Sequence, residues 1–113
     1  MDTAADAITV IDDQLRDAGV QFIAAKKLRY LDEGQRQIYT RHPESAQISD
    51  SKIIVSAPPV IDETTDPISI TRDFQMALVH YVCWKCLSEN TDDEQNQALA
   101  AKHESDYEKA MAA

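Results

Sequence analysis

Apolar residues near the start of the chain recur at the spacing of an amphipathic helix. The stripe consists of Ile8, Ile11 and Leu15. These positions share one helical face, and Thr3 followed by Asp6 has the spacing of a capping box. Gly19 ends the pattern. We expect a first helix over residues 4–17 that buries this stripe and leaves its aspartates in water.

A second helical stripe follows and stops at a proline. Its members are Ala24, Leu28, Leu31, Gln35 and Ile38. Because the ring of Pro43 removes an amide donor and cannot continue a helix, the pattern predicts a helix over residues 24–41. Gly34 inside it costs about 1 kcal/mol relative to alanine. Either a close crossing with another helix or simple tolerance of this cost explains the glycine.

In residues 43–70 the apolar positions no longer recur at the spacing of a helix. Prolines, serines and threonines surround two β-branched runs, KIIVS and ISI. We expect a short extended or β-strand arm between the second and third helices. Any strand near Pro58 and Pro59 lies at an edge, because proline donates no amide hydrogen bond. Ile53, Ile54 and Val55 either cover the helices or add a strand to a neighbouring subunit.

The most apolar part of the chain is MALVHYVCWKCL, Met76 to Leu87, which only His80 and Lys85 interrupt. A helix that is apolar on nearly all sides must be enclosed by other elements. Thr71 has the side chain of an N-cap. The pattern predicts a central, enclosed helix over residues 72–89.

Two cysteines, Cys83 and Cys86, have CxxC spacing at the end of this apolar run. A redox CxxC normally occupies a helix N-terminus, where the dipole stabilises the thiolate. A zinc site needs four ligands, and the chain adds only His42, His80 and His103, with no second paired motif. Both cysteines are therefore interpreted as core residues.

The stretch TDDE, residues 91–94, is a capping box with an acidic first turn that complements a helix dipole. The stripe that follows consists of Ala100, His103, Tyr107 and Met111. It predicts a fourth helix over residues 92–110. His103 on this stripe is interpreted as a hydrogen-bonded packing residue rather than a ligand or base.

These elements predict one mainly α domain over residues 1–113, a four-helix bundle with the arm at residues 43–70. The predicted core contains Leu28, Leu31, Ile38, Phe74, Leu78, Tyr81, Val82, Cys83, Trp84, Cys86 and Tyr107. The second helix also concentrates basic residues, namely Lys26, Lys27, Arg29, Arg36 and Arg41. These side chains either face solvent, form ion pairs with acidic residues of the chain, or contact a binding partner.

Charge and motifs narrow the function classes. Acidic residues outnumber basic ones by 20 to 11 in 113 residues, a net charge of -9, which argues against broad binding to phosphate backbones or anionic lipid. The N-terminus lacks a signal-peptide pattern, so we expect a soluble intracellular protein without a membrane contact. The sequence has no glycine-rich phosphate loop, nucleophile elbow, HExxH or EF-hand pattern. We expect no enzyme activity, no cofactor and no metal.

The sequence resembles the head-to-tail connector, or adaptor, proteins of tailed bacteriophages. The resemblance lies in LRYLDEGQRQIYTRHPES of the second helix, the extended segment around SAPPV, the helical segment ALVHYV, and the spacing of Ala100, His103 and Tyr107. It covers nearly the whole chain. Many relatives carry a longer β-rich insertion before the paired prolines, and often a tryptophan where this chain has Phe22 and Ile23.

The resemblance implies a structural virion protein without chemistry of its own. Subunits of that family assemble as a ring, commonly twelvefold, between the portal protein ring and a downstream tail or neck protein. Double-stranded DNA passes through the ring without specific binding. The protein would be made in the host cytoplasm and reside in the virion neck. Candidate contacts with other subunits or the portal are Lys26, Lys27, Arg29, Arg36, Arg41, Ile53, Ile54, Val55, Pro58 and Pro59.

Two alternatives from other classes stay open. One is a non-viral helical adaptor or regulator that binds a single partner and forms no ring with a portal. The other is a small thiol or metal protein that uses Cys83, Cys86 and His80.

Overall fold

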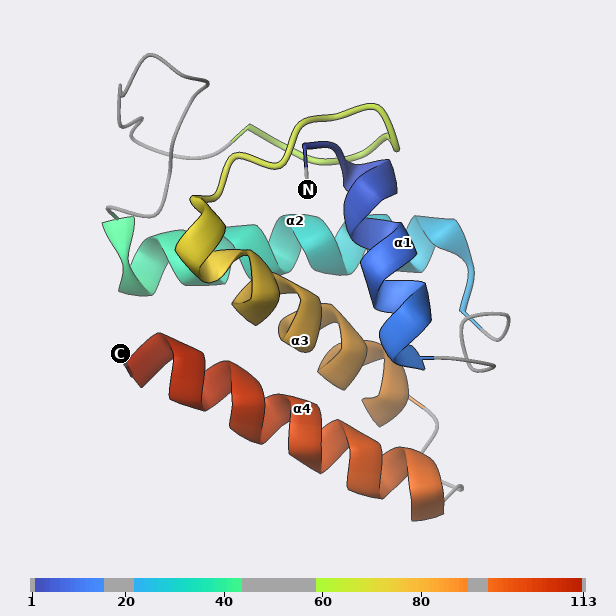
Figure 1. The fold of residues 1–113 in the computed structure, drawn as a ribbon. Helices are drawn as coiled ribbons and strands as arrows, with labels where there is room; N and C mark the ends of the chain where they lie inside the picture. Colours follow the sequence, from blue (N-terminus) through green and yellow to red (C-terminus); the bar gives the residue numbers. More distant parts are fainter. Residues whose placement is uncertain (1, 16–21, 44–58, 90–93, 113) are drawn as a thin grey trace.

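A computed structural model of the chain describes residues 2–15, 22–43, 59–89 and 94–112, which contain four helices (Figure 1). They are α1 (Ala4–Leu15), α2 (Ala24–Arg41), α3 (Arg72–Ser88) and α4 (Glu94–Ala112). The prediction of a mainly helical, four-helix fold is confirmed. α2 has the predicted bounds, α3 ends one residue earlier, and α4 ends two residues later. Residues 92 and 93, the predicted start of the fourth helix, lie outside the described residues. Residues 16 and 17, the predicted end of the first helix, lie outside the described residues.

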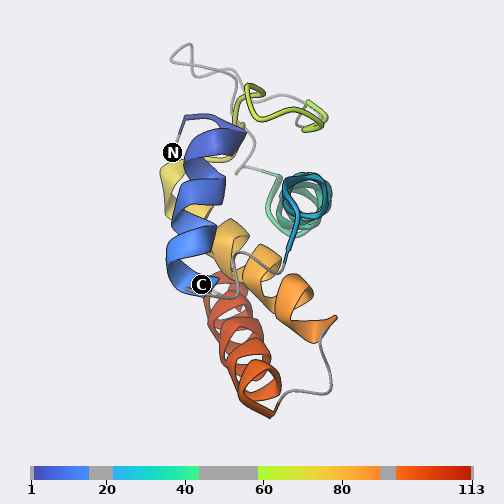
Figure 2. The ribbon, with the colours of Figure 1, turned by 90° about the vertical axis from the view of Figure 1, so that its right-hand side faces the viewer.

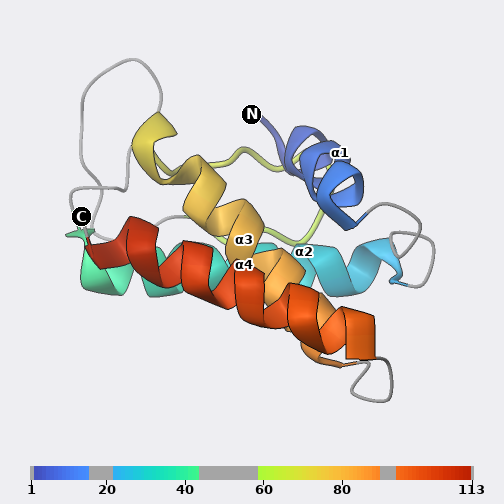
Figure 3. The ribbon, with the colours of Figure 1, turned by 60° about the horizontal axis from the view of Figure 1, so that its bottom comes forward.

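α3 is the central helix. It packs against α1, α2 and α4, most extensively against α4, and runs between α2 and α4 in Figure 1 and Figure 3. A helix covered from three directions must be apolar around most of its circumference, which explains the run MALVHYVCWKCL. Its buried residues are Ala77, Leu78, Val79, Tyr81, Val82, Cys83, Cys86 and Leu87.

Most of the predicted core is buried, and the exceptions lie at its edge. The buried members are Leu31, Ile38, Leu78, Tyr81, Val82, Cys83, Cys86 and Tyr107. Leu28, Phe74 and Trp84 are only partly buried and pack against the core. The expectation that Met76 is enclosed is wrong, because the residue is 46% exposed. Ala24, placed on the apolar stripe, is also exposed.

Gly34 marks a close crossing of α2 and α3. A Cβ atom at this position would lie 2.7 Å from Cδ1 of Tyr81 and 2.9 Å from Cδ1 of Leu78. Both distances are shorter than carbon atoms tolerate, and both side chains are buried. Of the two explanations for this glycine, the close crossing is therefore the correct one.

Residues 59–70 run beside α2 and past the start of α1 (Figure 2). The fully buried Gln35 holds this segment to α2. Its Oε1 accepts a hydrogen bond of 3.0 Å from the Ser69 amide, and its Nε2 donates one of 3.3 Å to the carbonyl of Pro59. Asp32 adds a bond of 3.1 Å from the Ile61 amide. The described part of the arm is thus packed onto the helices.

The same segment caps the start of α1. The amides of Ala4 and Ala5, which have no partner within the helix, donate to the carbonyls of Asp66 and Thr64 at 2.8 and 2.9 Å. The predicted capping box is confirmed: Oδ2 of Asp6 accepts from the Thr3 amide at 3.2 Å, and the Asp6 amide donates to the Thr3 hydroxyl at 3.4 Å.

Of the two alternatives left open for the arm, extended chain or β-strand, the described residues 59–70 form extended chain without a strand. The bridge between Thr3 and Pro67 is isolated. The Ile68 amide donates to the Asp2 carbonyl as part of this bridge, whereas the Ser69 amide donates to the Gln35 side chain, so the bridge is not extended at Ser69.

Three other predictions concern helix caps and the rest of the arm. Thr71 occupies the N-cap position of α3 but makes no side-chain cap hydrogen bond. The first β-branched run, with Ile53, Ile54 and Val55, lies outside the described residues, as do Pro58 and residues 91–93 of the second capping box.

Candidate functional site

Cys83 and Cys86 are free thiols without exposed surface. Burial raises the pKa of each thiol to about 12, so the nucleophilic thiolate is scarce near neutral pH. Their position agrees with the core prediction. The alternative of a thiol or metal site built from these residues and His80 loses support, because the grouping of metal-type ligands found among the described residues contains no cysteine.

Lys27 is a buried cation on α2. Its Nζ lies 2.6 Å from Oδ1 of Asp12 on α1, and only 5% of its side chain is exposed. A buried ammonium group needs such a partner, because removing the charge from water is costly. Lys27, a candidate from the sequence for contact with another subunit, is buried in the single chain and joins α1 to α2.

The other basic residues of α2 are exposed and have partners within the chain. The ion pairs are Lys26 with Glu89 (3.2 Å), Arg36 with Asp32 (3.3 Å) and Arg41 with Glu108 (3.3 Å). The Arg29 guanidinium lies 5.9 Å from the ring centre of Tyr30. Exposed pairs of this kind contribute little stability. Intramolecular ion pairing, one of the explanations left open by the sequence, is observed for Lys26, Arg36 and Arg41, and each of these groups stays accessible to a partner.

An aromatic cluster joins α3 to α4. The Tyr81 ring lies 5.3 Å from that of Tyr107 and 5.7 Å from that of Trp84, and the Lys85 ammonium lies 4.3 Å over Trp84. The Tyr81 hydroxyl donates to Glu33 on α2. Burial and this carboxylate raise the pKa of Tyr81 well above its ordinary value, so the phenol stays neutral. The cluster lines a shallow hollow of about 190 Å³.

A second hollow, of about 330 Å³, lies between the start of α2 and the segment that follows the paired prolines. Its lining residues are Ala25, Leu28, Arg29, Asp32, Val60, Ile61 and Asp62. Val60 is 55% exposed, and Ile23, which immediately precedes α2, is 63% exposed. Pro59 is exposed too. We use the name α2 edge for this hollow, with Arg29 and Val60 in its lining, together with the exposed Ile23 and Pro59, which lie within two residues of its lining in the sequence.

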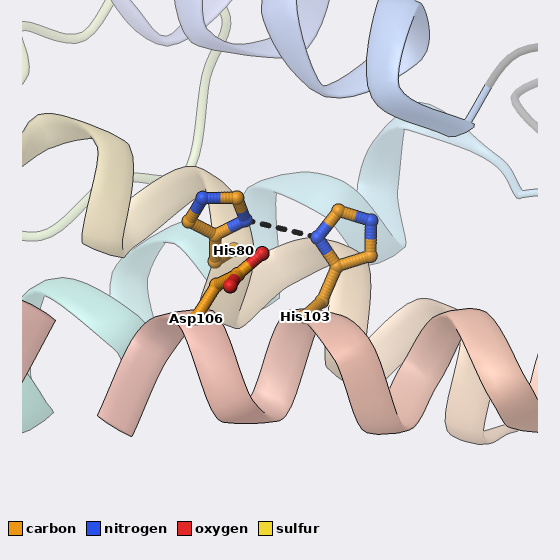
Figure 4. Close-up of side chains that lie close together, drawn as sticks. All are labelled: His80, His103 and Asp106. Atoms are coloured by element: carbon orange, nitrogen blue, oxygen red, sulfur yellow. Dashed lines mark hydrogen bonds between the residues drawn. The ribbon is translucent and has the colours of Figure 1, made fainter. Parts of the chain in front are cut away.

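His80 on α3 and His103 on α4 face each other (Figure 4). Their Nδ1 atoms lie 2.9 Å apart, and the ring planes are inclined by 35°. The Asp106 carboxylate lies next to them, one helical turn beyond His103. One potential ligand atom from each of the three residues lies within 4.8 Å of the others. His103 is buried, whereas His80 and Asp106 are half-buried.

Burial lowers the pKa of both histidines because it disfavours the charged imidazolium. The charge of Lys102 acts in the same direction, and Asp106 acts against it. Near neutral pH both rings are therefore neutral, and each has one N–H donor and one free lone pair. The short contact between the two Nδ1 atoms then requires opposite tautomers, with one ring donating to the other.

Sequence reasoning identified His103 as a hydrogen-bonded packing residue, and the bond to His80 agrees with that interpretation. It missed the group of three. The spacing of His103 and Asp106 on one helical face was readable, but the position of His80 opposite them depends on how α3 is aligned with α4. No periodic pattern in either helix specifies that alignment.

No protein-family model, curated protein or solved structure matches this chain. Among the described helices, none has the length and apolar content needed to cross a membrane.

Proposed function

We propose that the chain is a head-to-tail adaptor of a tailed bacteriophage, a structural protein that joins the portal ring to the tail around the DNA channel. The observation that carries this proposal is the meeting, in three dimensions, of the separate segments on which the family resemblance rests. These segments are GQR in α2, the paired prolines, ALVHYV in α3, and the stripe of α4.

Each of these segments touches another through a named contact. Gly34 of GQR makes room for Tyr81 of ALVHYV, whose ring lies 5.3 Å from Tyr107 of α4. Gln35 of GQR donates to the carbonyl of Pro59. Residues spread over most of the chain thus form one packing unit. This supports the view that the resemblance reflects a shared helical scaffold and not a chance match of letters.

The charge of the chain supports the proposed position around DNA. Each subunit has a net charge of -9, and the exposed cations Lys26, Arg36 and Arg41 are paired within the chain. A ring of such subunits repels phosphates within a Debye length of about 8 Å at physiological salt. DNA would pass such a wall without adhering to it, since tight phosphate binding needs clustered cations.

The α2 edge is the surface we assign to the neighbouring copy in the ring. Val60 exposes an apolar side chain at a hollow, and Ile23 exposes another immediately before α2. A self-associating ring needs exposed apolar surface on every subunit. Arg29 and Pro59, both candidates from the sequence, lie on it. The arm residues Ile53, Ile54, Val55 and Pro58 remain proposed contacts, outside the described residues.

The direct test is co-expression of the tagged chain with the portal protein of the same genome, followed by size-exclusion chromatography and native mass spectrometry. We expect the chain to elute with the portal ring in a fixed ratio. The substitution Val60→Asp should weaken the assembly of neighbouring copies on the portal at least tenfold, because a charge replaces an apolar contact between them. Leu99→Asp, at an apolar side chain that is 39% exposed on α4, is the matched control and should leave it unchanged.

A folded wild-type chain that never elutes with the portal would contradict the proposal and favour a non-viral adaptor. Equal loss of association in Val60→Asp and Leu99→Asp would contradict the assignment of the α2 edge alone.

A further inference from the structure

We propose that His80, His103 and Asp106 form a binding site for a divalent transition-metal ion, Zn²⁺ in particular, between α3 and α4. The inference goes beyond the proposed function and does not depend on it. It rests on the geometry of the three side chains in Figure 4 and on the chemistry of their donor atoms.

The spacing of the two histidines fits coordination to one ion. Nitrogen ligands at roughly 2.1 Å from an ion lie about 3.0 Å apart when they subtend a right angle and about 3.4 Å apart in a tetrahedron. The observed separation of the Nδ1 atoms of His80 and His103 is 2.9 Å. The separation of the two nitrogens therefore needs to grow by only about 0.1 to 0.5 Å for an ion beside the line between them. Each ring must also turn so that its Nδ1 lone pair points at the ion and not at the other ring.

The carboxylate completes a set of three ligands. Asp106 follows His103 by three residues on α4, so both side chains lie on the same helical face. Its oxygen lies within 4.8 Å of one ring nitrogen of each histidine. A change of side-chain torsion brings it into the coordination shell. Three protein ligands with one position left for water is a common zinc arrangement.

The donor types indicate the class of ion. Imidazole nitrogen suits Zn²⁺ and neighbouring transition metals, whereas Ca²⁺ and Mg²⁺ prefer shells made of oxygen. Asp106 supplies a negative charge, and the Lys102 ammonium opposes a cation at the site. In the metal-free pair one proton lies between the two Nδ1 atoms. On binding, that proton moves through solvent to Nε2 of its own ring, so neutral histidines bind the ion without net proton release.

Such an ion would join the two helices that share the largest contact in the molecule. His80 comes from α3 and the other two ligands come from α4, so the bound ion would cross-link them. Because the ion binds the folded chain and not the unfolded one, it should raise the melting temperature in proportion to the logarithm of its concentration.

The test is isothermal titration of ZnCl₂ into the full chain, after treatment with a chelator and dialysis, with MgCl₂ as the comparison ion. We expect one Zn²⁺ per chain and no saturable Mg²⁺ binding. A Zn²⁺ concentration a hundredfold above Kd should raise Tm by on the order of 10 °C. Asp106→Asn preserves shape and should weaken binding at least tenfold, as should His103→Gln. Lys102→Gln should tighten it.

Two controls separate this site from other ligands in the chain. His42→Gln removes a histidine outside the group, and the double substitution of Cys83 and Cys86 by alanine removes both thiols. Both variants should keep one-to-one Zn²⁺ binding, with helix content followed by circular dichroism. Nitrogen chemical shifts of the histidine side chains should show Nδ1 coordination in both rings.

Absence of saturable one-to-one binding by the folded wild-type chain would overturn the proposal and leave a hydrogen-bonded histidine pair. Binding that survives Asp106→Asn and His103→Gln, or that disappears when folded chain lacks the cysteines, would overturn it as well.

Discussion

Gln35 on α2 and Ser69 in the extended segment are joined by a buried hydrogen bond of 3.0 Å from the Ser69 amide to the Gln35 side-chain oxygen. The side-chain nitrogen of Gln35 donates a second hydrogen bond, to the carbonyl of Pro59. One side chain without exposed surface therefore holds both ends of residues 59–69 against α2. Burying a side-chain amide is costly unless its oxygen and its nitrogen are both hydrogen-bonded. Gln35 therefore favours the arrangement in which Ser69 and Pro59 both lie against α2.

The substitution Gln35→Leu should destabilise the chain by about 1–3 kcal/mol, because it leaves the Ser69 amide and the Pro59 carbonyl without this partner. Urea unfolding measures the loss, and hydrogen exchange at the Ser69 amide should accelerate. Gln37→Leu, at an exposed site of the same helix, is the control and should change stability by less than about 0.5 kcal/mol. Equal stability of the Gln35 variant and the wild type would refute this account of the arm.

The crossing at Gly34 predicts that a single added methyl group is harmful. Gly34→Ala gains about 1 kcal/mol of helix propensity, but its Cβ would press against Tyr81 and Leu78 in a packed core. Overpacking of this kind costs about 1–3 kcal/mol, and we expect net destabilisation in thermal unfolding. A more stable Gly34→Ala variant would show that α2 and α3 separate without difficulty.

The buried cysteines should be unreactive in the native chain. With pKa values of about 12 for Cys83 and Cys86, only about one thiol in ten thousand is ionised at pH 8. An aromatic disulfide reagent should therefore modify neither cysteine of the folded chain within minutes and both of them in urea. Rapid modification without urea would place the thiols in contact with solvent and revive the redox alternative.

The capping box should give a pH-dependent contribution to stability. The amides of Asp2 and Thr3 donate to Asp6 and lower the pKa of its carboxyl below the ordinary value of 3.8. A group whose pKa is lower in the folded state contributes above the unfolded pKa, and this contribution is lost as the pH falls through the folded value. Asp6→Asn should therefore flatten the decline in unfolding free energy below about pH 4.

Asp13→Asn, at an exposed carboxylate of the same helix, removes an equal charge and serves as the control for Asp6. Its acid unfolding curve should keep the wild-type slope. If Asp6→Asn also kept that slope, the capping box would contribute nothing in solution.

The positions of the helices could be predicted from the sequence because apolar periodicity and helix-ending residues are local features of the chain. α2 has the predicted bounds, and the α4 stripe with His103 and Tyr107 is buried as its period requires. The exposure of Met76 could not be predicted in this way. Its helix is apolar at nearly every position of this run, so periodicity does not indicate which residues the neighbouring helices leave uncovered.

The charged and polar sites depended on pairings between distant residues. Lys27 appeared as one of five similar cations, and only the approach of α1 made it the buried partner of Asp12. The group of His80, His103 and Asp106 likewise needs the alignment of two helices. Periodicity predicts which face of a helix is buried, but it does not say which residue of another helix that face meets.

The most direct test of the proposed adaptor role is electron cryomicroscopy of the portal vertex in tailed particles from the genome that encodes this chain. The account predicts a ring of density directly beneath the portal, with one copy of α1 to α4 fitting each repeat and acidic side chains facing the DNA channel. A resolved neck whose density is filled entirely by other proteins would contradict it.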